Sequence, residues 1–297
     1  MIEAVKACRS KSPRVARVRA DLLVVQRGLA ASRERARALI LAGQVRSGSA
    51  VVDKAGALLA ADAPLEVRRP ARFVSRGGEK LEHALDAFGL RVEGRRCVDI
   101  GASTGGFTDC LLQRGATRVV TVDVGHGQLD PKLRGDPRVL VLERTNARRI
   151  RPGDLPELAD LVTMDVSFIS AAMLVPAALA LLQPGGVLVV LVKPQFEVGR
   201  GEVGKGGVVR DPAKHRRAVA AVAHAAVEAG AALRGLCPSA LLGPKGNREF
   251  FLRLTAGGPS REVEEILATV FPEPRPEVDG KNPRQEAQGK RQERVLA

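Results

Sequence analysis

Apolar residues follow two patterns along this chain of 297 residues, and the pattern changes near residue 74. Before it, apolar positions recur at helical spacing between glycine turns, which predicts a small α+β module. After it, short apolar runs alternate with helical segments, the signature of a mostly parallel sheet with helices on both faces. The strands predicted in this second part are 97–100, 119–123, 139–142, 161–165, 187–192, 233–236 and 249–254. The predicted helices are 79–88, 108–114, 171–182, 212–229 and 261–270.

The N-terminal module has recognisable start and stop signals. A short helix at 20–26 precedes a second helix that Ser32 caps, and short strands follow near Val45 and at 65–67. We divide the chain into a flexible arm (1–17), this module (18–69), a linker (70–74), the α/β domain (75–272) and a C-terminal tail (273–297). The arm and the tail are polar and lack apolar periodicity, so we expect both to be disordered.

The excess of positive charge is concentrated in the module. The whole chain has 47 Lys and Arg against 33 Asp and Glu, a net charge of +14. Residues 1–72 contribute +9 of it, the tail +1, and the remaining 200 residues only +4. A basic module joined to a nearly balanced domain is typical of a nucleic-acid anchor, so we expect a polyanionic partner.

The composition argues against a membrane, metal or disulfide protein. The longest apolar run, 169–182, is interrupted by polar residues and is shorter than the ~20 residues needed to span a bilayer. No apolar segment typical of a signal peptide lies near the N-terminus, so we expect a cytoplasmic protein. The four cysteines and four histidines are scattered without metal-ligand spacing, which argues against a disulfide framework and against a metal site.

The segment VDIGASTGGFTDCL, residues 98–111, combines a predicted strand, a glycine-rich turn and a helix start. Such a turn lets the backbone approach a nucleotide-like ligand closely. Its glycines are Gly101, Gly105 and Gly106, a spacing that differs from the one that seats a dinucleotide pyrophosphate. Asp123 ends the next strand, where a carboxylate accepts ribose hydroxyls in NAD sites and in other nucleoside sites. The combination favours a nucleoside pocket over a purely structural turn.

Two charged residues follow buried strands at the same predicted edge of the sheet. Lys193 comes directly after 187–192, and Asp165 ends the neighbouring run. If the reaction is methylation, residues 165–168 lack the prolines typical of enzymes that methylate base amino groups, and no cysteine stands at a strand end for methylation of base carbon. A lysine fits methylation of a ribose 2′-hydroxyl, either as a base or as a cation that stabilises the oxyanion. Both roles stay open, because an amine base at pH 7 needs a depressed pKa.

Residues 28–45, GLAASRERARALILAGQV, resemble the S-four-like RNA-binding module of a small-subunit ribosomal protein and of pseudouridine synthases. The resemblance implies that Arg33, Arg37 and Arg46 face structured RNA. The chain departs from the module in the turn after the first strand, where Ser47-Gly48-Ser49 replaces the usual Asn-Gly. For arginines on a helix surface, a merely solvated face is the simpler alternative.

Seven strings in order resemble the TlyA family of FtsJ-like ribose 2′-O-methyltransferases, which are often labelled hemolysin A: FVSRGGEKLEHAL, DIGASTGGFT, DVGHGQL, LERTNAR, MDVSFIS, LVKPQFEVGRGEVG and GPKGNREFFL. The resemblance implies a Rossmann-like, class I S-adenosylmethionine-dependent methyltransferase with a catalytic tetrad of Lys80, Asp165, Lys193 and Glu249. The cofactor contacts that it implies are Gly101, Ala102, Ser103, Thr104, Gly105, Gly106, Phe107, Asp123, Asn146 and Asp165. The implied substrate is ribosomal RNA in ribosomal subunits, with a cytidine ribose as the target.

Further RNA contacts and other functions are open alternatives. The loop 196–210 is glycine-rich and contains Arg200 and Lys205, so it either closes over RNA or is a mobile surface loop. Base stacking has to rely on phenylalanine (Phe107, Phe168 or Phe196) or arginine, because the chain has no Trp or Tyr. The competing functions are a membrane-lytic hemolysin, a non-catalytic RNA-binding factor of ribosome assembly, and a nicotinamide oxidoreductase, which the glycine spacing disfavours.

Overall fold

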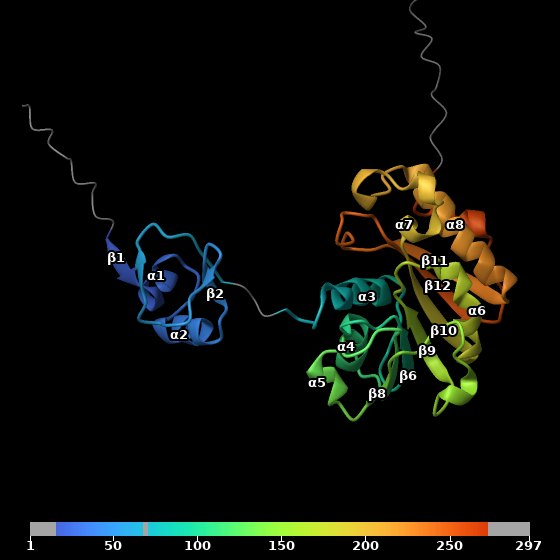
Figure 1. Cartoon of the computed structure of the whole chain (residues 1–297), viewed down its shortest axis with the longest axis horizontal. Helices are drawn as coiled ribbons and strands as arrows, with labels where there is room; N and C mark the ends of the chain where they lie inside the picture. The colour runs from blue at the N-terminus through green and yellow to red at the C-terminus, as the bar shows by residue number, and fades with distance from the viewer. Residues whose placement is uncertain (1–15, 68–70, 273–297) are drawn as a thin grey trace, which may run out of the picture. The chain divides into compact units, whose positions relative to one another are not determined.

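The computed structural model describes residues 16–67 and 71–272, and the chain divides into two compact units between Arg72 and Phe73 (Figure 1). Most of the predicted arm, part of the predicted linker and the predicted tail lie outside the described residues. Each unit is described by itself.

In its described residues, 16–67 and 71–72, the smaller unit has two helices and short strands around a small core. Its elements in chain order are β1 (Arg17–Arg19), α1 (Ala20–Gln26), α2 (Arg33–Leu41), β2 (Val45–Ser47), β3 (Ala50–Val51), β4 (Leu58–Ala60) and β5 (Leu65–Val67). The Ser32 hydroxyl accepts a hydrogen bond from the Arg35 backbone N–H at 3.1 Å, which fixes the start of α2 as the sequence predicts. The sequence predicts β2 and β5 but not β1, β3 and β4, since strands of two or three residues show a period of two only weakly.

The larger unit is built on a seven-stranded sheet. Its strands are β6 (Arg96–Ile100), β7 (Arg118–Val122), β8 (Val139–Leu142), β9 (Ala159–Met164), β10 (Leu182–Val192), β11 (Ala231–Pro238) and β12 (Phe250–Ala256). Their order across the sheet is β11-β12-β10-β9-β6-β7-β8. β12 runs antiparallel to both neighbours, and the other neighbouring strands are parallel. The predicted α/β class with a mostly parallel seven-stranded sheet is confirmed, and each predicted strand overlaps an observed one.

Helices cover both faces of this sheet (Figure 1). Alternate residues of β10 belong to two different clusters of buried apolar side chains, one on each face. One cluster includes residues of α3 (Arg76–Ala87), α4 (Gly106–Gln113) and α5 (Pro131–Arg134). The other includes residues of η2 (Ala171–Met173), α6 (Val175–Ala180), α8 (Pro212–Glu228) and α9 (Val263–Ala268). The remaining short helical segments are η1 (Pro152–Asp154), α7 (Pro194–Glu197), η3 (Arg200–Glu202) and η4 (Lys205–Gly207).

The prediction of one helix over 171–182 is wrong. The segment forms a 3-10 turn, then the separate helix α6, and Leu182 already belongs to β10. Pro176 lies in the first turn of α6. Proline has no N–H and its ring clashes with the preceding helical turn, so it begins a helix readily but interrupts one that has already started.

The strand order creates a crevice between the carboxyl ends of β6 and β9. These two strands are neighbours, and the chain continues from β6 toward one edge of the sheet and from β9 toward the other. Open α/β sheets bind ligands where the order reverses in this way. Gly101 follows β6, Asp165 follows β9, and Lys193 follows β10. The fold therefore brings the glycine-rich turn and both strand-end charges to one edge.

Candidate active site

The turn between β6 and α4 presses its backbone against the loop after β9. Gly101 has φ +82°, and a Cβ at this position would lie 2.4 Å from the Asp165 carbonyl oxygen. Only glycine fits both the left-handed backbone and the close approach. The Asp123 carboxylate holds the turn from the other side, because it accepts hydrogen bonds from the backbone N–H groups of Ser103 at 2.8 Å and Gly125 at 2.7 Å. The turn is thus fixed before any ligand binds.

A cavity of about 740 Å³ lies at this edge of the sheet, and all four residues of the predicted tetrad line it. Lys80 comes from α3, and Glu249 stands directly before β12. Asp165 and Lys193 follow their strands. The structure therefore brings together four side chains that are separated by up to 169 residues in the chain.

Lys80 and Glu249 form a buried ion pair in the cavity wall. The Lys80 ammonium donates a hydrogen bond to Glu249 Oε2 at 2.6 Å, and the side chains are 8% and 1% exposed. Gly243 packs over the other carboxylate oxygen, since a Cβ there would lie 2.4 Å from Glu249 Oε1. A buried charge is tolerated only when it is paired, so each residue depends on the other.

Lys193 and Asp165 form the second pair. Lys193 Nζ lies 2.5 Å from Asp165 Oδ1 and donates a hydrogen bond to the Ser167 hydroxyl at 2.9 Å. Asp165 Oδ1 accepts no directed hydrogen bond from the described residues, so the lysine contact is electrostatic rather than an aligned hydrogen bond. Sequence reasoning missed Ser167. Its only signal is its position two residues after Asp165.

A second cavity of about 350 Å³ adjoins the first. Gly101, Ser103, Asp165, Ser167 and Phe168 line both. Of the predicted cofactor residues, Gly101, Ser103, Asp123, Asn146 and Asp165 line the smaller cavity, and Ala102, Thr104, Gly106 and Phe107 line only the larger one. Gly105 lines neither cavity. Its φ of +95° and its packing under Leu129 and Leu133 assign it to the turn itself.

Asp99, inside β6, is a buried acid that the sequence did not single out. The hydroxyls of Thr108 and Thr163 donate hydrogen bonds to its two carboxyl oxygens at 2.7 Å and 3.2 Å. Burial raises the pKa of Asp99 to about 7, against the opposing effect of these hydrogen bonds. The group ties α4 and β9 to the strand that precedes the glycine-rich turn.

The candidate stacking residues differ in exposure. Phe107 is buried, with its ring centroid 6.1 Å from that of Phe251, so it belongs to the core. Phe168 is 91% exposed at the rim of both cavities and has φ +65°. Its ring centroid lies 5.2 Å from that of Phe196. Phe168 and Phe196 therefore offer an aromatic surface beside the cavities.

Three arginines of the smaller unit lie around one buried acid. Asp21 is fully buried, and the side chains of Arg19, Arg33 and Arg37 approach it to 3.0, 2.9 and 3.7 Å. The hydrogen bond from Arg19 is the main cause that holds the pKa of Asp21 well below its usual range. Arg33 and Arg37 are about half exposed, so both also face solvent.

The other predicted RNA contacts are placed separately. Arg46 donates a hydrogen bond to the Ser49 carbonyl. Lys205 is exposed in η4, and the side chain of Arg200 lies outside the described residues. Within 16–67 and 71–272, no group of three His, Cys, Asp or Glu side chains is arranged to hold a metal ion. No helix in this part of the chain has the length and apolar character to cross a bilayer.

Known proteins resemble this chain along most of its length. Residues 73–256 match the FtsJ-like methyltransferase family. The 16S/23S rRNA (cytidine-2′-O)-methyltransferase TlyA of Mycobacterium tuberculosis is 52% identical over 240 residues, which cover 80% of this chain and 90% of that protein. Hemolysin A of Brachyspira hyodysenteriae is 41% identical over 78% of this chain and 98% of that protein.

A solved structure is also similar to this chain. The structure of a candidate hemolysin from Streptococcus thermophilus has a TM-score of 0.65 and 40% sequence identity, and the match covers 86% of this chain and 96% of that chain. The family that the sequence resemblance predicts is confirmed. This chain is a methyltransferase of the FtsJ-like family, in the branch that includes TlyA.

Proposed function

We propose that the protein transfers a methyl group from S-adenosylmethionine to the 2′-hydroxyl of a cytidine ribose in ribosomal RNA. The observation that carries the proposal is the pair of adjoining cavities at the carboxyl edge of the sheet, one beside Asp123 and one walled by two lysine–carboxylate pairs. The relative named rRNA (cytidine-2′-O)-methyltransferase, 52% identical over most of the chain, supports the substrate class.

The smaller cavity fits the nucleoside part of the cofactor. Asp123 would hold the ribose hydroxyls, Asn146 would lie beside the adenine, and the backbone of the glycine-rich turn would approach the ligand where Gly101 leaves no room for a side chain. When bound, the cofactor would supply a methyl group that is activated by its bond to a positively charged sulfur. Asp165 lines both cavities, so the donor and acceptor sites meet beside it.

Lys193 acts on the 2′-oxygen. Asp165 and Ser167 hold its nitrogen, which fixes the position of that group in the cavity wall. As an ammonium, Lys193 stabilises the developing oxyanion; as a neutral amine, it removes the hydroxyl proton. Lys80 and Glu249, paired on the same cavity wall, orient the ribose. These four residues form the proposed catalytic tetrad.

The smaller unit anchors the RNA. Arg33 and Arg37, which are about half exposed, and Arg46 bind phosphates. Arg200 and Lys205 of the loop 196–210 are further candidate RNA contacts, as the sequence predicts. Phe168 and Phe196 stack on a base beside the reacting ribose. The partner is ribosomal RNA within ribosomal subunits, which places the protein in the cytoplasm.

Replacing Lys193 by Ala tests the catalytic assignment. We expect methyl transfer to ribosomal RNA to fall by about 10²-fold or more. Calorimetric affinity for S-adenosylmethionine should stay within a few-fold, because Lys193 does not line the smaller cavity. The matched control is Lys132→Ala, at an exposed lysine of α5 in the same unit. Near-normal turnover of the Lys193 variant would overturn its role.

Two further measurements resolve the substrate and the role of Lys193. Ribose methylation is mapped in ribosomal RNA from both subunits with and without the protein, and we expect a new 2′-O-methylcytidine. Methylation of a base atom would overturn the proposed reaction, and methylation of another ribose would overturn the cytidine assignment. A rate that rises with pH identifies Lys193 as a base, whereas a rate that falls as the ammonium loses its proton identifies a stabilising cation.

A further inference from the structure

Three arginines form a second cationic group away from the proposed tetrad. Arg253 lies in β12, Arg234 in β11, and Arg95 directly before β6. Arg253 is paired with Val189 of β10, four residues before Lys193, which is about 13 Å along the strand. Arg95 and Arg253 are each two residues from a member of the buried cluster that faces α3, Cys97 and Phe251 respectively. Side chains two residues apart along a strand share a face, so Arg253 points to the α3 side, and the charge of Arg95 acts on it.

An irregularity in β11 brings Arg234 to the same group. The pairing register with β12 shifts between Leu233 and Gly235, so Arg234 is the extra residue of a β-bulge. Bulges re-aim side chains, and here the Arg234 Nε donates a hydrogen bond to the Thr255 hydroxyl at 3.0 Å. Gly258, with φ +94°, leaves room for the guanidinium, because a Cβ there would lie 2.7 Å from Arg234 Nη2. The bulge and Gly258 thus together accommodate the Arg234 side chain.

The guanidinium of Arg253 is only partly satisfied by the described residues. Its Nη1 donates a hydrogen bond to the Phe88 carbonyl at the end of α3 at 3.0 Å, and its buried Nε has no acceptor among the described residues. Burial, followed by the charges of Arg234 and Arg95, lowers the pKa of Arg253. No acidic side chain of the described chain forms an ion pair with it.

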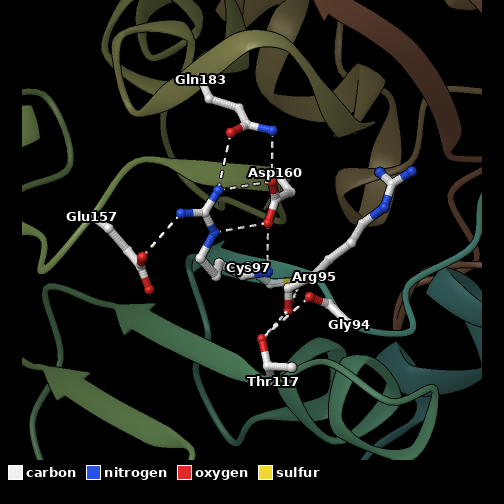
Figure 2. Close-up of polar contacts among 8 residues, drawn as sticks. Gly94, Arg95, Cys97, Thr117, Glu157, Asp160 and Gln183 are labelled. Carbon is white, nitrogen blue, oxygen red and sulfur yellow. Dashed lines mark hydrogen bonds and ion pairs between the residues drawn. The ribbon is translucent and has the colours of Figure 1, made fainter.

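Asp160, an acid whose pKa is lowered mainly by its hydrogen bond with Arg96 and also by the charge of Arg95, is already paired with Arg96. Asp160 accepts hydrogen bonds from Arg96 Nε and Nη2 at 2.9 and 3.0 Å and from Gln183 at 2.6 Å (Figure 2). Figure 2 also shows the Arg95 side chain pointing away from this cluster, with no contact drawn to its guanidinium. Asp160 is thus shared between Arg95 and Arg96, and Arg234 and Arg253 form no ion pair with the described residues. Like charges that are held close together destabilise a protein, so such a group favours an anionic ligand.

We propose that Arg95, Arg234 and Arg253 form a binding site for a phosphate group, separate from the catalytic cavity. Guanidinium groups bind phosphate oxygens through paired hydrogen bonds, and a doubly charged phosphate would neutralise the cluster. The phosphate comes either from an RNA backbone or from a free phosphate compound. The site does not depend on the proposed methyl transfer.

Titration calorimetry with inorganic pyrophosphate, on the full chain at low ionic strength, tests the site. We expect Arg234→Gln and Arg253→Gln to weaken pyrophosphate binding at least tenfold. The matched control is Arg118→Gln, an exposed arginine at the start of β7, which should bind like the wild type. If Arg253→Gln does not fold, Arg95→Gln takes its place, because no hydrogen bond of the Arg95 side chain is lost. Wild-type protein without pyrophosphate binding, or Arg234 and Arg95 variants with unchanged affinity, would overturn the proposal.

Competition identifies the source of the phosphate. A single-stranded RNA oligonucleotide is added to the wild-type protein saturated with pyrophosphate. Direct RNA binding is not informative, because the smaller unit is itself a proposed RNA anchor. Displacement of the Arg234-dependent pyrophosphate would support an RNA backbone at this site, whereas RNA that leaves it bound would support a free phosphate compound.

Discussion

The Lys80–Glu249 pair links the stability of the larger unit to its proposed active site. Replacing Lys80 by Met keeps the length of the side chain but leaves the Glu249 carboxylate, 1% exposed, without its partner. Removing one member of a buried ion pair costs about 3–5 kcal/mol, because the other charge remains buried and uncompensated. Lys80→Met should therefore destabilise this unit strongly.

The loss of stability caused by Lys80→Met has an upper limit that depends on pH. The unpaired carboxylate can take up a proton instead, and for a glutamate with an ordinary pKa of about 4.3 this costs about 3.7 kcal/mol at pH 7 and about 1 kcal/mol at pH 5. We therefore expect Lys80→Met to lose about 3–4 kcal/mol at pH 7, a fall in melting temperature of roughly 6–16 °C. The loss should shrink as the pH is lowered toward 5.

Calorimetric melting at pH 5 and 7 measures this effect, together with methyl-transfer activity. The double variant Lys80→Met and Glu249→Met leaves no buried charge, so it should recover most of the stability of the wild type but none of its activity. The control Lys132→Met removes an exposed lysine and should change stability by less than about 0.5 kcal/mol. A Lys80→Met protein that melts with the wild type at both pH values would refute the buried-charge reasoning.

Two further acids, Asp99 and Asp21, should contribute to stability with opposite dependences on pH. Burial raises the pKa of Asp99 to about 7, so the stabilisation by its protonated form is complete below the ordinary pKa of 3.8 and is lost as the pH rises to 7. The melting temperature should therefore fall over this pH range, and Asp99→Asn should remove that fall. An unchanged pH dependence in the variant would contradict the assignment. Arginines hold the pKa of Asp21 low, so its contribution is present above pH 3.8 and is lost at more acidic pH. Asp21→Asn should therefore lower the melting temperature of the smaller unit at pH 7 and lower it less at pH 2. It should also weaken RNA binding in a filter assay; wild-type affinity would show that Asp21 does not position Arg33 and Arg37.

The strands of the larger unit are predictable because most are continuous apolar runs bounded by glycine, proline or charge. The beginning of β10 is not. Leu182 pairs with Ala159, and the register then shifts before Val187, so the strand begins with one pairing and an irregularity rather than with an apolar pattern. The error over 171–182 has a related cause, since apolar residues flank Pro176 on both sides and hide the break.

The candidate site is predictable only in part. Lys193 and Asp165 follow buried strands, and this position alone identifies them. Lys80 lies on a helix, and Glu249 precedes β12, which is next to the edge of the sheet. Charged residues are common at such positions, so only the family resemblance identifies these two. Their pairing, and the contact between Lys193 and Ser167, depend on which strands are neighbours. No spacing along the chain encodes that order.

Asp123 could bind the ribose of the cofactor, hold the glycine-rich turn, or do both, and a double-mutant cycle separates these roles. The sequence predicts a ligand for ribose hydroxyls, but each of its oxygens already accepts a backbone N–H, from Ser103 and from Gly125. Each carboxylate oxygen has two lone pairs, so one on each remains for a ribose. Asp123→Asn replaces an acceptor by a donor and should weaken cofactor binding by about 10-fold or more, since a hydrogen bond to a charged group contributes about 1.5–3 kcal/mol.

That loss alone would not distinguish the roles. Calorimetry with S-adenosylhomocysteine and with its 2′-deoxy analogue, on wild type and Asp123→Asn, measures their coupling. If Asp123 binds the ribose, removing the hydroxyl should cost the wild type clearly more than the variant, with a coupling above about 1 kcal/mol. If Asp123 only holds the turn, the two changes should add to within about 0.5 kcal/mol. We expect coupling, because Asp123 lines the smaller cavity while it supports the turn.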